Sequence, residues 1–101
     1  MFVRIAKFEG AASEGFDATR EQIEADMSSG NTPEGLEGAT EVMLLVDREG
    51  GTALGAVFFE TEDDLRRGDQ ALNAMSPGDG GGRRSGVEMY ELAFRGTPSR
   101  A

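Results

Sequence analysis

The strongest hydrophobic pattern lies in residues 39–60, where two apolar runs flank the turn Arg48-Glu49-Gly50-Gly51. Neither run alternates between apolar and polar residues, because positions of both parities are apolar in 42–46 and in 53–59. Successive side chains of a strand point to opposite faces. Both faces of this predicted hairpin are therefore expected to be shielded from water.

Two helices and two further strands are predicted around this hairpin. The first helix carries apolar residues at the 3.6-residue spacing of one helix face. The second begins at a capping signal, in which Thr61 is followed three residues later by Asp64. Gly68 inside this helix is expected to weaken it by up to ~1 kcal/mol relative to alanine. The elements are strands at residues 2–8 and 85–94, a helix from Ser13 or Asp17 to about Ser28, and a helix at residues 61–75.

The order β-α-β-β-α-β predicts an α+β, ferredoxin-like fold, in which one antiparallel sheet carries both helices on the same face. The other face is then left with apolar side chains such as Phe2, Leu44, Leu54 and Phe58. An exposed apolar area of several hundred Å² is near the upper limit for a soluble monomer. We therefore expect a homodimer in which the two sheets pack face to face.

Length and composition indicate a single domain. A chain of 101 residues can bury one modest core, which we assign to residues 1–95, with a polar C-terminal tail at 96–101. A strand pattern starts directly after Met1, so no signal peptide is expected, and no apolar run approaches the roughly 20 residues of a membrane span. Cysteine is absent, which excludes disulfides and thiolate metal sites and indicates a cytoplasmic protein.

The charge balance argues against several classes of function. A formal net charge of −9 disfavours nucleic acid and anionic membranes as partners, because both are negatively charged. Histidine is absent, which removes an imidazole base, histidine-ligated haem or zinc, and histidine-dependent nucleophiles. The densest carboxylates, in residues 60–64, are explained by helix capping and lack EF-hand spacing. We therefore predict neither a metal site nor a cofactor.

A few polar side chains are candidates for a binding or catalytic site. Strand parity allows Arg4 and Tyr90, together with Glu88, to point inward, and Asn73 on the second helix could join them. The planar fork of Arg4 suits a ligand carboxylate or phenolate. The alternative is that Arg4 makes an ion pair across a subunit interface and that Tyr90 only packs. The carboxylate partner of Arg4 would then be Glu41, Glu60 or Glu91.

The methionines and a glycine-rich segment add two further hypotheses. Met27, Met43, Met75 and Met89 fall on apolar positions, where they either fill the core or form a pliable pocket for a flat apolar ligand. Residues 76–82 (SPGDGGG) cannot hold regular structure and are the natural place for a lid. A phosphate-binding role is disfavoured, because phosphate loops precede a helix whereas this segment precedes a strand.

Four segments carry a resemblance to a known family. They are the loop 33–38 (PEGLEG), the run 44–51 (LLVDREGG), the run 56–65 (AVFFETEDDL) and the closing strand 87–92 (VEMYEL). Together they resemble the dimeric α/β-barrel superfamily and, within it, the antibiotic-biosynthesis-monooxygenase-like proteins. The run 72–94 (LNAMSPGDGGGRRSGVEMYELAF) resembles uncharacterised actinobacterial members of that group.

The resemblance implies a dimeric barrel with a ligand pocket between sheet and helices in each subunit. Some members oxygenate aromatic polyketides without metal or flavin, whereas others degrade haem or only bind ligands. Catalytic members generally use asparagine, tryptophan or histidine in the pocket. This chain contains neither tryptophan nor histidine, which argues against haem degradation.

Two functions therefore stay open. The first is binding of a small apolar or aromatic metabolite without catalysis, and the second is cofactor-independent oxygenation of phenolic or polyketide-like substrates. Either ligand is expected to lie between the sheet and the helices. The residues expected to line this pocket are Arg4, Met27, Phe58, Asn73, Met75 and Tyr90, of which Arg4, Asn73 and Tyr90 are the catalytic candidates.

Overall fold

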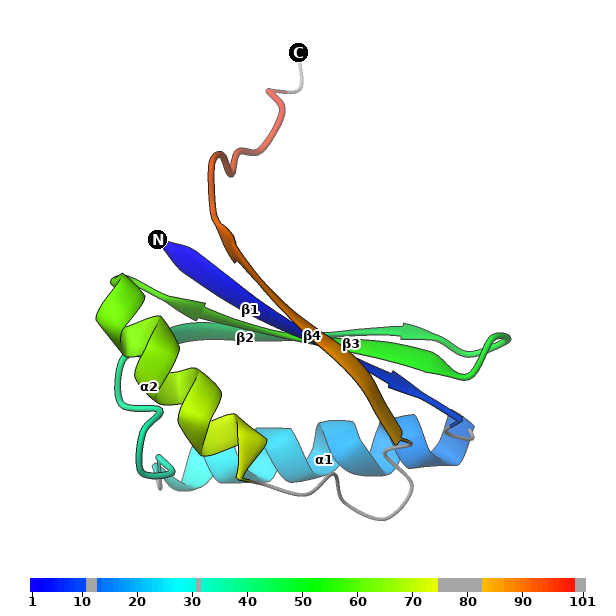
Figure 1. Ribbon diagram of the computed structural model, residues 1–101. Helices are drawn as coiled ribbons and strands as arrows, with labels where there is room; N and C mark the ends of the chain where they lie inside the picture. Colours follow the sequence, from blue (N-terminus) through cyan, green and yellow to red (C-terminus); the bar gives the residue numbers. More distant parts are fainter. Residues whose placement is uncertain (11–12, 31, 75–82, 100–101) are drawn as a thin grey trace.

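The computed structural model describes residues 1–10, 13–30, 32–74 and 83–99, and it contains the six predicted elements in the predicted order. The four strands form one layer, and both helices lie on the same side of it (Figure 1). The elements are β1 (Phe2–Glu9), α1 (Ser13–Ser29), β2 (Ala39–Asp47), β3 (Thr52–Phe59), α2 (Glu62–Asn73) and β4 (Arg83–Glu91). Met75 and the lid expected at residues 76–82 lie outside the described residues.

The sheet is antiparallel throughout, and its strand order is β2-β3-β1-β4. This topology, with both helices on one face, confirms the ferredoxin-like α+β prediction. β4 ends at Glu91 and not at residue 94, because Glu91 already lies opposite Phe2, the first residue of its partner strand β1. The backbone amide of Leu92 still donates to the carbonyl of Met1 at 2.8 Å, and the following segment then leaves the sheet (Figure 1).

The pairing register assigns each side chain to one of two sheet faces. Phe59 packs against Gly68 of α2, so Phe59 and every second residue before it in β3 face the helices. Phe2 lies opposite Phe59, and Leu44 lies opposite Gly55, on that same face. The expectation that Phe2 and Leu44 lie on the helix-free face is therefore wrong. When the odd and the even positions of a strand are both apolar, the sequence does not show which set faces the helices.

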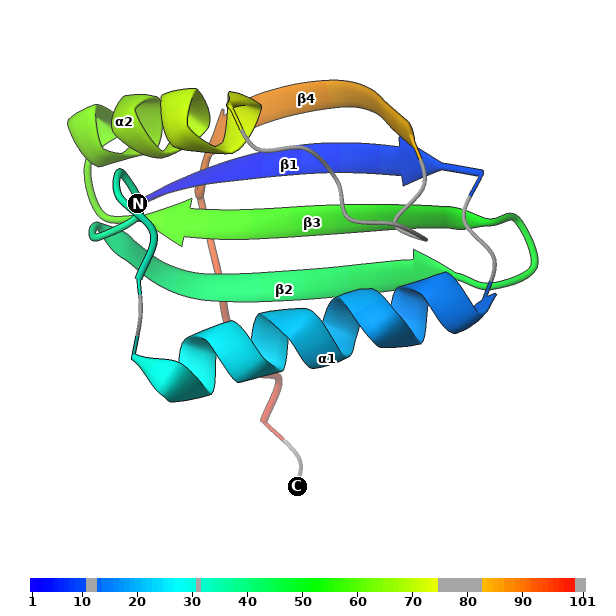
Figure 2. The same cartoon turned by 90° about the horizontal axis from the view of Figure 1, so that it is seen from below.

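The face without helices, called the outer face below, is partly covered by the chain itself. Val3, Ala56 and Phe58 form a buried apolar cluster there. The segment after β4 passes behind the strands in Figure 2, and the Arg95 guanidinium lies 4.9 Å from the centre of the Phe58 ring. Nη2 of Arg95 is 3.0 Å from Oε1 of Glu41 on the edge strand β2. The prediction of an entirely bare face is thus wrong, because residues 92–95 cover one end of it.

Two sequence features position α2. Thr61 is its N-cap, and the hydroxyl of Thr61 accepts a hydrogen bond from the backbone amide of Asp64 at 3.1 Å, as predicted. Gly68, expected to be a weak point, is instead required by packing. A β-carbon at this position would lie 2.5 Å from Cε1 of Phe59 and closer still to Cζ. The missing side chain lets α2 approach β3 closely.

α1 contacts the sheet mainly at its N-terminal half. Phe16 is buried and forms a cluster with Ala53 and Leu44. Further along the helix, Ile23 is half-buried and Met27 is 62% exposed. The predicted apolar stripe therefore reaches the sheet at one end of α1 and leaves space beside it at the other. Neither described helix is long and apolar enough to cross a membrane.

Candidate functional site

A cavity of about 440 Å³ lies between the helix-facing side of the sheet and the two helices. α1 runs along β2 and α2 lies near β1, so the middle of the sheet is not covered by either helix (Figure 2). Side chains from β1, β2, β3, α1, α2 and residues 32–37 line the cavity. Most of its wall is apolar. The apolar residues that line it come from several elements and include Phe8, Ile23, Leu36, Leu44, Val57 and Leu72.

Small residues in the floor explain why space remains here. Ala6 of β1 lies directly opposite Gly55 of β3, and both line the cavity. A β-carbon on Gly55 would touch only the Phe8 ring, at an ordinary distance of 3.8 Å. The pair therefore leaves a shallow depression in the middle of the sheet, which larger residues at the same positions would fill.

Arg4 provides the buried charge of the site. Its side chain is 4% exposed, and its Nε donates to Oδ1 of Asp69 at 2.8 Å. Nη2 of Arg4 donates to Oδ1 of Asn73 at 3.0 Å. Asp69 and Asn73 are four residues apart on α2 and thus lie on one helix face. A buried guanidinium requires such compensation, and here it comes from within the same chain.

The same network reaches β4. Asn73 Oδ1 also accepts from Nη1 of Arg84 at 3.0 Å, and Nδ2 of Asn73 lies 3.3 Å from Oδ2 of Asp69. The partner of Arg4 in this structure is therefore Asp69, a residue of the same chain. Strand parity directs Arg4 toward α2, whereas Glu41 lies opposite Phe58 on the outer face.

Asp69 is the site residue that the sequence interpretation missed. The signal that could have found it is the spacing of Asp69 and Asn73, which gives α2 two polar groups on one face. Arg4 is the only charged residue at an even-numbered position of residues 2–8, the parity that also holds Phe2, Ala6 and Phe8. An arginine among buried apolar residues needs a partner for its charge, and a carboxylate on the facing helix can be that partner.

The structure brings together some of the predicted site residues and separates others. Arg4 and Met27 line the cavity, and Asn73 is joined to it through Arg4. Phe58 and Tyr90 both lie opposite Val3, so they are on the outer face and do not reach the cavity. The Tyr90 hydroxyl donates to the carboxylate of its same-face neighbour Glu88. Met75 lies outside the described residues.

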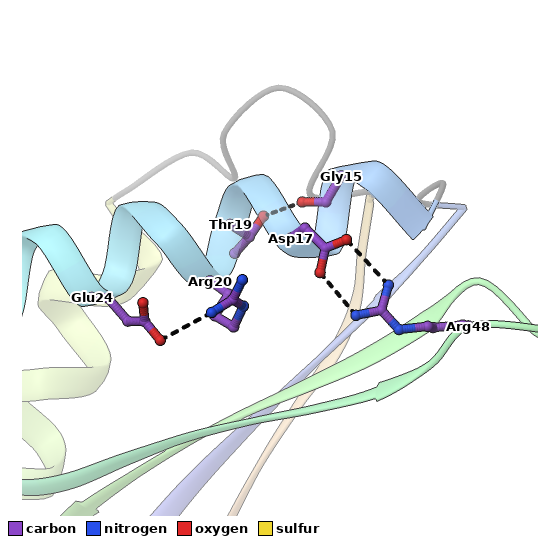
Figure 3. A network of polar contacts seen from close by, with 6 residues as sticks. All are labelled: Gly15, Asp17, Thr19, Arg20, Glu24 and Arg48. Carbon is purple, nitrogen blue, oxygen red and sulfur yellow. Dashed lines mark hydrogen bonds and ion pairs between the residues drawn. The ribbon is translucent and has the colours of Figure 1, made fainter.

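A second, smaller groove of about 280 Å³ is lined by residues of α1 and β2 and by Arg48. At one end the Arg48 guanidinium faces the Asp17 carboxylate, with Nη2 2.9 Å from Oδ1 (Figure 3). The hydrogen bond from Arg48 lowers the pKa of Asp17 below its usual value of 3.8. A further ion pair joins Arg20 to Glu24 at 3.3 Å within α1. The Asp17–Arg48 pair connects α1 to the turn between β2 and β3.

The described part of the chain offers no cluster of three or more acidic side chains that would hold a metal ion. The Arg4 network supplies a guanidinium, the Asp69 carboxylate and the Asn73 amide beside the cavity. These groups can hold a polar edge of a ligand or accept a proton from it.

No protein-family model matches the chain, and no curated protein sequence matches it. Solved structures, in contrast, do match the chain. A monooxygenase from the gene ActVA-Orf6 of Streptomyces coelicolor, in complex with Nanaomycin D, aligns over 97% of this chain and 92% of its own, with a TM-score of 0.64 and 14% identity. A mutant of MhuD with two manganese protoporphyrin IX molecules per active site aligns over 97% and 100%, with a TM-score of 0.62 and 11% identity.

An antibiotic biosynthesis monooxygenase aligns over 93% of this chain and 100% of its own, with a TM-score of 0.50 and 12% identity. At such identities the likeness concerns the fold alone. The alignments with the first two of these structures cover 97% of this chain. The chain thus has the ferredoxin-like fold of the antibiotic-biosynthesis-monooxygenase-like proteins, as the resemblance of its sequence implies.

Proposed function

We propose that this protein binds a small apolar or aromatic molecule in the cavity between sheet and helices, without transforming it. The observation that carries the proposal is the mostly apolar cavity of about 440 Å³, because ligand sites in proteins occupy about 300–1,000 Å³ and have few polar groups. The neighbours with bound Nanaomycin D and manganese protoporphyrin IX support it, since the same fold holds a flat molecule in both.

Binding without catalysis is favoured by the residues beside the cavity. The chain lacks histidine and tryptophan, and its one buried guanidinium already has a carboxylate partner. A group that is fully compensated in the empty protein offers less transition-state stabilisation than a preorganised but unpartnered donor.

Two valine substitutions at matched glycines test this proposal. Gly55→Val fills the cavity floor, whereas Gly86→Val adds the same side chain on β4, where a β-carbon would meet nothing within 4 Å. With the uncharged dye N-phenyl-1-naphthylamine as probe, the wild type and Gly86→Val should show enhanced fluorescence and a raised Tm. At a dye concentration of 100 Kd the stabilisation would be about 2.7 kcal/mol. Equal binding by Gly55→Val would refute this site.

We also propose a homodimer formed through the outer face. Beyond the cluster covered by residues 92–95, the outer face exposes Met43, Leu45 and Tyr90, and Leu45 is 51% exposed. Pairing this face with a second copy removes these side chains from water. Sedimentation velocity should find a dimer that Leu45→Glu dissociates, whereas Ala18→Glu, with the same added charge at an exposed position of α1, leaves it intact. A wild-type monomer in dilute solution would refute the dimer.

A cofactor-independent monooxygenase is the second candidate, and the Arg4–Asp69–Asn73 network favours it. In such a reaction a phenolic substrate transfers an electron to dioxygen, while a carboxylate takes its proton and a cation holds the resulting anion. Anthrone and dioxygen would give anthraquinone and water. Turnover should then fall in Arg4→Gln and stay unchanged in Tyr90→Phe, because Tyr90 lies on the outer face. Absence of anthraquinone would leave the binding function alone.

A further inference from the structure

We infer that the cavity selects uncharged ligands and rejects anions, an inference that rests on the proposed binding function. Arg4 is a cationic residue in the wall, and its planar fork would ordinarily be expected to receive a ligand carboxylate or phenolate. The contacts of Arg4 assign it a different role, in which it connects β1 to α2 through hydrogen bonds.

The charge of Arg4 is already compensated inside the protein. Its Nε contacts the Asp69 carboxylate at 2.8 Å, and its Nη2 contacts the Asn73 amide oxygen at 3.0 Å. An anionic ligand near Arg4 would also lie near the Asp69 carboxylate, so attraction and repulsion largely cancel. Burying the charge of the ligand would then cost free energy, and the Arg4–Asp69 pair would not offset this cost.

Besides Arg4, the charged described residues that line the cavity are Asp26, Glu37 and Glu41. The carboxylates of Asp26 and Glu37 are the ones that can face a ligand, because Glu41 lies opposite Phe58 on the outer face. The carboxylate of Glu41 lies 3.0 Å from Arg95 on the outer face, which compensates it. Glu37 accepts a hydrogen bond from the backbone amide of Gly35 at 3.0 Å. Backbone hydrogen bonds lower the pKa of Glu37, so it remains charged at neutral pH.

Two nearby cations reduce this negative potential without reversing it. Arg84 contacts the Asn73 amide and is not a member of the cavity wall, and Arg67 lies 3.9 Å from Asp64 on exposed α2. The chain as a whole carries a formal charge of −9, so the surrounding field also opposes an entering anion. The groups in the cavity wall lie nearest to the ligand and are less screened by salt, so they contribute most to the exclusion of anions.

Two dyes with the same ring system separate charge from shape. N-phenyl-1-naphthylamine is uncharged, whereas 8-anilinonaphthalene-1-sulfonate carries one sulfonate on the same skeleton. Fluorescence titration of the full chain gives a Kd for each dye, and the signal that Gly55→Val removes is the cavity signal. The uncharged dye should bind more tightly, and the sulfonate dye should gain affinity with added salt, because salt screens the repulsion.

Charge-neutralising variants make the test independent of the dyes' own hydrophobicity. Asp69→Asn releases the charge of Arg4 and should improve the affinity for the sulfonate dye, relative to the uncharged dye, about tenfold. Glu37→Gln on the exposed rim should improve it in the same direction by a smaller factor. Glu21→Gln, which removes one negative charge from the exposed surface of α1, should leave the ratio nearly unchanged.

The possible results distinguish the inference from the function on which it rests. If the sulfonate dye binds the wild-type cavity more tightly, or if both neutralising variants leave the ratio unchanged, the cavity accepts anions and the inference is wrong while binding stands. If neither dye gives a signal that Gly55→Val removes, the proposed binding function fails, and the inference fails with it.

Discussion

Gly68→Ala is expected to destabilise the protein, although the same change stabilises most helices. In a helix interior, alanine is favoured over glycine by about 0.5–1 kcal/mol. Here the new β-carbon would lie 2.5 Å from Cε1 of Phe59, a side chain that is completely buried and cannot rotate away. Inserting a carbon into a packed core costs about 1–3 kcal/mol, so the middle of both ranges gives a net loss on the order of 1 kcal/mol in the free energy of unfolding.

Urea denaturation followed by far-UV circular dichroism measures this loss, since the chain has no tryptophan for fluorescence. At roughly 4–8 °C per kcal/mol for a domain of this size, the shift in Tm is readily resolved. All variants are compared at one protein concentration, because a dimer would make their stability concentration-dependent.

A double-mutant cycle with Phe59→Leu identifies the cause. Leucine lacks the ring atoms that approach Gly68, so in this background Gly68→Ala should be neutral or stabilising. If Gly68→Ala stabilises the wild type, or if its cost is the same in both backgrounds, then Phe59 does not lie against Gly68. The packing of α2 on β3 described above would then be wrong.

Three further changes test separate parts of the fold. Gly35→Ala should destabilise the protein strongly, because Gly35 has φ +94° and the new β-carbon would lie 2.6 Å from the β-carbon of Ala71. Thermal unfolding measures the loss as a lower Tm. Thr61→Ala removes the α2 N-cap and should lower the free energy of unfolding by about 1 kcal/mol in urea. Arg48 lowers the pKa of Asp17, so this pair stabilises the fold above the ordinary pKa of 3.8, and the stabilisation is lost as the pH falls through the lower pKa of the folded state. An Asp17→Asn variant should therefore lose less stability than the wild type on acidification. Equal losses in the two proteins would contradict the ion pair.

The sequence was sufficient for the order of elements, because that order depends on local signals. The turn at residues 48–51, the Thr61 cap and the change of apolar period each act over a few residues. The close approach of α2 to β3 could not be predicted in the same way. Gly68 is recognisable only as a helix breaker until its neighbour across the core, Phe59, is known. A local propensity rule then gives the wrong sign for the effect of that residue on stability.

The candidate site depended on register, and register was the weakest part of the prediction. Arg4 lies opposite Met89 in β4, so Met89 shares its face and Tyr90 points outward. Shifting β4 by one residue would exchange Met89 and Tyr90 and bring a phenol beside the buried guanidinium. Both residues are large and fit an apolar surface, so hydrophobicity cannot decide between the two registers. The pairing of β1 with β4 is also irregular between Lys7 and Phe8, so counting back from the strand ends gives no reliable register. The Arg4–Asp69 contact identifies the helix-facing parity, and that parity excludes Tyr90 from the cavity of this chain.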